Sequence, residues 1–145
     1  MLDHLFRPTL RMQPAPTVSA SQRLKRMYGY IGAICWVLIL PVKEARRLDL
    51  GIDPVVFGIA PSLIGPAGLL LVILSSERRF ARLTIARATR LAGTVALGLE
   101  FAQILPFVRR IYTFDWRDVA ATLPGLCAGA LVALGLRRWY QAASR

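Results

Sequence analysis

The sequence predicts an all-α integral membrane protein with four transmembrane helices and both termini in the cytoplasm. Of the 145 residues 55% are hydrophobic, and the 19 Lys and Arg residues, which dominate a formal net charge of +11, cluster between long apolar blocks. A nucleic-acid-binding protein would interleave its cations with polar and aromatic residues on a solvated face. We therefore expect membrane lipids as partners and no nucleic acid.

Four apolar blocks are candidate spans, at residues 27–42, 55–74, 91–108 and 119–136. The second block is about 30 Å long at a helical rise of 1.5 Å per residue, which is enough to cross the hydrocarbon core. The third and fourth blocks are near the lower end of the spanning range. The first block is short, so it needs snorkelling flanks or local thinning of the bilayer to cross. Three spans plus a re-entrant segment is the alternative arrangement.

The distribution of Lys and Arg predicts the orientation of these spans. Five cations precede the first span, five lie in the loop at residues 75–90 and three follow residue 136, whereas the loops at 43–54 and 109–118 carry three each. By the positive-inside rule, the termini and the 75–90 loop are cytoplasmic and the other two loops face outward. Aromatic residues expected at the membrane interfaces are Tyr28, Tyr30, Trp139 and Tyr140 inside, and Tyr112, Phe114 and Trp116 outside.

The domain organisation follows from the same blocks. Residues 1–26 are proline-containing and basic, and we interpret them as an irregular tail before a four-helix transmembrane domain at 27–140 and a short tail at 141–145. Cys35 and Cys127 fall inside spans, where small packing residues are more common than disulfides. The single histidine, His4, is in the leading tail. We therefore expect no metal and no cofactor.

Glu100 is the only ionisable residue between residues 91 and 108. A charge at membrane depth costs several kcal/mol, so such an acid suggests a functional site and needs a partner. On a helix Glu100 shares a face with Gln103. Arg109 and Arg110 come about 13 Å further along the axis, too far for easy pairing. We expect the nearest partner of Glu100 to be Gln103 or water.

The outer loop places two acids where the fourth span begins. Asp115 is suited to cap that helix and Asp118 to occupy its first turn, and both favour the positive end of the helix dipole. These acids are also the expected partners of Arg109 and Arg110. A cap fixes its carboxylate in space, so this structural role is compatible with binding.

A stripe of small residues continues from these acids along the fourth span. On a helical projection, Asp118, Thr122, Gly125 and Gly129 fall on one side. Small residues at four-residue spacing allow two membrane helices to approach closely. Gly125 is also at the depth expected for Glu100. We therefore expect the third and fourth spans to pack face to face around Glu100.

These residues together resemble a family signature, whose elements in order are Glu100, Gln103, an arginine at 109 or 110, Asp115, Asp118, Gly125 and Gly129. The signature is that of the VanZ-like family of small bacterial membrane proteins, and the resemblance covers residues 91–136. Thr122 stands where the family usually has asparagine. The resemblance implies a four- or five-helix protein of the bacterial inner membrane and, for some members, low-level resistance to teicoplanin, a glycopeptide that acts on cell-wall precursors.

Four functions are compatible with this pattern. The first is recognition of an envelope lipid headgroup or a glycopeptide by the outward cluster, since arginines suit phosphate and acids suit amines. The second is an enzyme with Glu100 or Asp118 as general acid or base, ranked lower because no nucleophile or metal motif accompanies them. The third is a non-catalytic structural subunit of a larger membrane complex with protein partners. The fourth is a proton-coupled exporter, disfavoured because Glu100 is in the third helix instead of the first.

Overall fold

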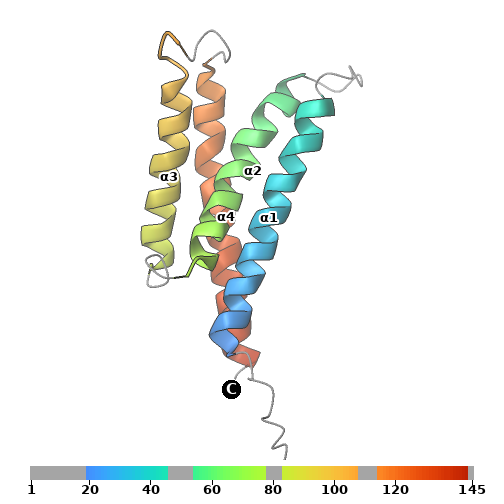
Figure 1. Cartoon of the computed structure of the whole chain (residues 1–145), viewed down its shortest axis with the longest axis vertical. Coiled ribbons are helices and arrows are strands. Elements are labelled where there is room, and N and C mark those ends of the chain that lie inside the picture. The colour runs from blue at the N-terminus through green and yellow to red at the C-terminus, as the bar shows by residue number, and fades with distance from the viewer. Residues whose placement is uncertain (1–18, 46–53, 78–82, 108–113, 144–145) are drawn as a thin grey trace, which may run out of the picture.

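The computed structural model describes residues 19–45, 54–77, 83–107 and 114–143, and all its regular elements there are helices. These are α1 (Ala20–Ala45), α2 (Pro54–Ser75), α3 (Ile85–Ala102) and α4 (Trp116–Ala143). Successive helices run antiparallel, and α2 packs against all three others (Figure 1). The all-α class is thereby confirmed. The termini of the helices form two ends of the bundle, the Glu100 end, where α3 finishes and α4 begins, and the opposite end, where α1 begins.

Local capping explains why α1 is longer than predicted. The Ser19 N–H donates to Gln22 Oε1 and the Gln22 N–H donates to Ser19 Oγ, each over 3.3 Å, which forms a capping box. The helix therefore begins at Ala20 and not at residue 27, and residues 20–26, assigned to the irregular tail, are helical. Its 26 residues make α1 about 39 Å long. Residues 1–18 of the predicted tail lie outside the described residues.

The third helix is shifted toward the N-terminus relative to its predicted range of 91–108. Thr84 caps α3 by accepting a hydrogen bond of 3.3 Å from the Arg87 N–H. The other end tightens into a turn in which the Gln103 N–H donates to the Glu100 carbonyl and the Leu105 N–H to the Ala102 carbonyl. Proline at 106 has no N–H to continue the ladder. Glu100 is therefore in the last turn of α3, and not in the middle of a span.

The remaining two helices agree with the sequence to different degrees. The bounds of α2, Pro54–Ser75, differ from the predicted 55–74 by one residue at each end. By contrast, α4 begins at Trp116 and runs to Ala143, beyond the predicted 119–136 and into the predicted C-terminal tail. The helix α4 remains continuous past Pro124, as α2 does past Pro61 and Pro66.

The interior of the bundle is built largely from small side chains, while large apolar ones face outward. One buried cluster joins Leu70, Ala88, Ala92 and Leu126, and a second joins Tyr28, Leu71 and Ala133. Exposed large residues occur on every helix, including Ile34, Val37 and Leu40 on α1, Leu63 and Val72 on α2, Val95 and Leu99 on α3, and Leu123 and Leu131 on α4. Tyr28, expected at an interface, is instead a core residue.

Among the described helices, α4 is the one that is long and apolar enough to cross a membrane. A third of its most apolar 18-residue window is buried in the bundle. Residues Ile59–Ser75 of α2 form a shorter apolar helix. The arrangement with four spans therefore stays a prediction.

Glycines allow close approach at the α1–α2 and α2–α4 crossings. A Cβ atom on Gly68 of α2 would come within 2.8 Å of Cys35 Cβ on α1. A Cβ atom on Gly125 of α4 would overlap the Leu63 carbonyl oxygen of α2, and one on Gly129 would lie 2.9 Å from Ala67 Cα. The two glycines of the α4 stripe therefore contact α2 instead of the expected α3, although α3 and α4 also pack against each other.

Candidate functional site

The predicted polar cluster is at the Glu100 end of the bundle, where α3 finishes beside the start of α4 (Figure 1). Glu100 comes from the last turn of α3 and Asp118 from the first turn of α4. Ser62 comes from α2 and is bonded to Glu100. The side chains of Glu100, Gln103 and Asp118 are all partly buried. The cluster thus combines groups from α2, α3 and α4, and not from α3 and α4 alone.

Both carboxylate oxygens of Glu100 accept hydrogen bonds from neutral groups. Gln103 Nε2 donates to Oε2 over 2.8 Å, which confirms the expected partner on the same helix face. Ser62 Oγ donates to Oε1 over 3.5 Å, at the limit of a hydrogen bond. A carboxylate has about four acceptor sites, so these two bonds orient Glu100 without saturating it.

Sequence reasoning missed Ser62. A signal was present, since Ser62 is the only residue with a polar side chain in the block at 55–74. The pairing itself could not be read from the sequence because Ser62 and Glu100 are 38 positions apart. Proline at 66 adds to the local polarity, because it has no N–H for the Ser62 carbonyl four residues earlier.

Asp115 is the N-cap of α4, as expected. Its Oδ1 accepts a hydrogen bond of 2.9 Å from the Arg117 N–H, and its carbonyl accepts one of 3.0 Å from the Asp118 N–H. Asp118 follows in the first turn and lies near enough to Glu100 for the two acids to interact electrostatically. The start of α4 therefore places a second acid near Glu100.

The other predicted site residues have different environments. Thr122 is fully buried and its hydroxyl donates to the Asp118 carbonyl over 3.0 Å, so its donor is used within α4. Gly125 and Gly129 pack against α2. Arg109 and Arg110 lie outside the described residues. The structure thus brings together Glu100, Gln103 and Asp118, with Asp115 capping the helix beside them and Thr122 beneath.

An aromatic contact joins the two segments that carry the acids. The rings of Phe101 and Phe114 stack with their centroids 6.2 Å apart and their planes 23° apart. Phe101 follows Glu100 directly and Phe114 precedes Asp115 directly. The stack therefore helps to fix the end of α3 beside the start of α4.

The side chains of the cluster are mainly hydrogen-bond acceptors. Two acids, an amide and a hydroxyl favour ligands that carry ammonium or hydroxyl donors. In the described part of the chain, no three His, Cys, Asp or Glu residues are grouped so that they could hold a metal ion. No protein-family model, curated protein or solved structure matches the chain.

Proposed function

We propose that the chain is a multi-pass bacterial inner-membrane protein, similar to the VanZ-like family, whose polar cluster at the Glu100 end binds an envelope lipid headgroup or a glycopeptide. The observation that carries the proposal is Glu100, oriented by Gln103 and Ser62 next to Asp118, at one end of an otherwise apolar bundle. Maintaining such acids beside an apolar core is costly, which favours a functional role.

The outward distribution of apolar side chains supports the membrane placement. Water-soluble bundles bury most of their large apolar residues, whereas here alanine and glycine make many of the helix contacts and many leucine, valine and isoleucine side chains are exposed. Trp116 and Trp139 mark the two ends of α4 and are 68% and 61% exposed. They are about 35 Å apart along the axis, which suits aromatic belts at the two interfaces of a bilayer.

The positive-inside distribution supports an outward-facing cluster. The cation-rich 75–90 loop joins α2 to α3 at the opposite end, so the Glu100 end would face away from the cytoplasm. At that surface the ammonium or hydroxyl groups of a ligand would bind Glu100 and Asp118. If the ligand also carries a phosphate, the arginines of the 109–118 loop would bind it.

The experiment replaces Glu100 by Gln and Asp118 by Asn in separate variants. Both changes keep the size of the side chain and its acceptor oxygen, so we expect the free energy of unfolding to change by about 1 kcal/mol or less. We expect both variants to alter the susceptibility of expressing cells to cell-wall-directed glycopeptides at equal protein abundance. Thermal unfolding of the detergent-extracted protein and growth inhibition are the measurements.

The Gly125→Ala variant is the control, since it disturbs helix packing without touching an acid. If glycopeptide susceptibility follows the melting temperature in all three variants, the cluster has only a structural role. If Glu100→Gln and Asp118→Asn change neither quantity, these acids have no role in function and the proposal fails.

The alternative is a non-catalytic structural subunit of a membrane complex. One observation favours it, because the hydrogen bond from Ser62 to Glu100 joins α2 to α3 and would lock these helices together. In that case Ser62→Ala and Glu100→Gln should lower the melting temperature by similar amounts. The binding proposal expects glycopeptide susceptibility to respond to Glu100→Gln more than to Ser62→Ala.

A further inference from the structure

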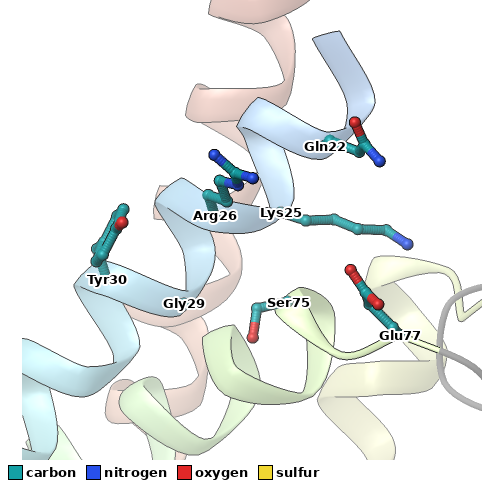
Figure 2. A pocket seen from close by; sticks show the side chains of 7 residues that line it. All are labelled: Gln22, Lys25, Arg26, Gly29, Tyr30, Ser75 and Glu77. Carbon is teal, nitrogen blue, oxygen red and sulfur yellow. The ribbon is translucent and has the colours of Figure 1, made fainter. Parts of the chain in front are cut away.

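A polar groove lies at the end of the bundle opposite Glu100 (Figure 2). It has a volume of about 430 Å³ and is lined by Gln22, Lys25, Arg26 and Tyr30 of α1 and by Ser75 and Glu77 at the end of α2. Gly29 lies between the two walls, and a Cβ atom there would be in van der Waals contact with Ser75 Cβ at 3.4 Å. This volume is within the range of small-molecule sites.

The groove offers cations and a neutral donor. Lys25 extends across it toward the α2 side (Figure 2). Gln22 uses its side-chain oxygen in the capping box with Ser19, which leaves its NH₂ group available to a ligand. The Ser75 hydroxyl donates to the Val72 carbonyl over 2.7 Å, so Ser75 could act only as a hydrogen-bond acceptor for a ligand. Lys25, Arg26 and Gln22 are therefore the groups suited to a phosphate.

The sequence places this groove at the boundary between apolar and charged segments. Lys25 and Arg26 directly precede the uncharged residues 27–42, and Glu77 directly follows the uncharged residues 54–76. Because α1 and α2 run antiparallel, the two boundaries meet at one level (Figure 1). Cations at such a boundary lie among lipid headgroups, and Tyr30, one turn deeper, suits the interface.

We propose that this groove binds the phosphate of a membrane phospholipid, with Lys25, Arg26 and Gln22 as its ligands. Two cations against the single acid Glu77 leave the groove positive. Glu77, on the other wall, accepts hydrogen bonds from headgroup hydroxyl or ammonium groups beyond the phosphate. The inference rests on the proposed membrane placement but not on the polar cluster at the Glu100 end.

The test measures the melting temperature of the full chain in a neutral detergent with added phosphatidylglycerol, phosphatidylcholine or inorganic phosphate. A ligand that binds the native state raises its melting temperature. We expect a saturable rise with phosphatidylglycerol, a smaller rise with phosphatidylcholine, whose headgroup has no hydrogen-bond donor, and none with inorganic phosphate at the same concentration. A rise of equal size with inorganic phosphate would assign the site to free phosphate and overturn the lipid proposal.

Two charge-matched double variants locate the site. The double variant Lys25→Gln, Arg26→Gln should abolish the lipid-dependent rise in melting temperature. The control is Arg137→Gln, Arg138→Gln, which changes an adjacent exposed pair near the C-terminal end of α4, at the same end of the bundle, and should retain the rise. Glutamine is a good helix former, so both proteins should keep their helicity by circular dichroism. Retention of the rise in the first variant, or equal loss in both, would overturn the proposal in favour of diffuse charge attraction.

A third variant tests the wall that carries the acid. Glu77→Gln should increase the preference for phosphatidylglycerol over phosphatidylcholine while keeping the rise itself, because it removes a negative charge that attracts the choline cation and repels the anionic lipid. An unchanged preference would remove Glu77 from the site. Because the Glu100 cluster is at the other end of the bundle, glycopeptide susceptibility should be the same in Glu77→Gln and in the parent protein, which separates failure of this inference from failure of the proposed function.

Discussion

Tyr28 shows how one side chain can join helices that are distant in sequence. Its ring is 5% exposed and packs with Leu71 and Ala133, and its hydroxyl donates to the Ala133 carbonyl of α4 over 2.8 Å. A buried tyrosine needs such a partner because an unpaired hydroxyl in an apolar interior is costly. Tyr28 therefore stabilises the contact between α1 and α4.

Replacement of Tyr28 by Phe tests this bond. The ring and its packing remain while the hydrogen bond is lost, so we expect the free energy of unfolding to fall by about 1 kcal/mol. Chemical denaturation in detergent, followed by circular dichroism, measures the change. Tyr30→Phe is the matched control, since Tyr30 is largely exposed, and its effect should be within about 0.5 kcal/mol. Equal losses in the two variants would contradict the role of the Tyr28 hydroxyl.

At the scale of the helices, backbone contacts at glycine determine which elements meet. The α2–α4 crossing is made at Gly125 and Gly129, against Leu63 and Ala67. The contact between α3 and α4 is of a different kind, with a Leu126 methyl group only 3.1 Å from where a Cβ of Gly93 would be. The helix α2 thus receives the closest approach of α4, and α3 packs at the side.

Alanine substitutions at two glycines should have opposite effects. Gly125→Ala places a methyl group against the Leu63 backbone, which cannot move without parting α2 and α4, so we expect a loss of about 1–3 kcal/mol. Gly98→Ala meets no neighbouring atom within 4 Å and should stabilise α3 by up to about 1 kcal/mol. Melting temperatures of the two variants provide the comparison. A rise in both would show that α2 and α4 do not cross at Gly125.

At the scale of the whole molecule, the positions of the charged groups distinguish the two ends of the bundle, and exposed apolar side chains lie between them. Large apolar side chains are exposed on all four helices, most Lys and Arg residues in the described part of the chain are at the opposite end, and the acidic cluster is at the Glu100 end. In the proposed topology, the two sites proposed for this chain would face different sides of a membrane. One would contact envelope components and the other the cytoplasmic leaflet.

Cysteine labelling tests the proposed orientation of the bundle in the membrane. In a Cys35→Ala, Cys127→Ala background, Ile104→Cys and Ala143→Cys place single thiols at exposed positions on the two ends of the bundle. We expect a membrane-impermeant thiol reagent to label position 104 on intact cells, and position 143 only after the cells are opened, because of the positive-inside distribution. Labelling of both positions on intact cells would contradict the proposed topology.

The sequence by itself determined the local features of this protein. Helical periodicity and hydropathy determined the all-α class and the bounds of α2, the i, i+3 spacing determined the bond from Gln103 to Glu100, and the position before a helix determined the Asp115 cap. Each depends only on residues a few positions apart. Capping by Ser19 and Thr84 also depends on nearby residues, and it places the starts of α1 and α3 before their predicted positions.

Only the tertiary structure decided which helix faces meet. The glycine stripe of α4 could have met α1, α2 or α3, because close approach depends on a small surface and not on the identity of its partner. In the structure it contacts α2, Ser62 of α2 donates to Glu100, and Tyr28 donates to the Ala133 carbonyl. These pairings join residues far apart in the sequence. Their geometry depends on how four helices share one interior, which no single segment encodes.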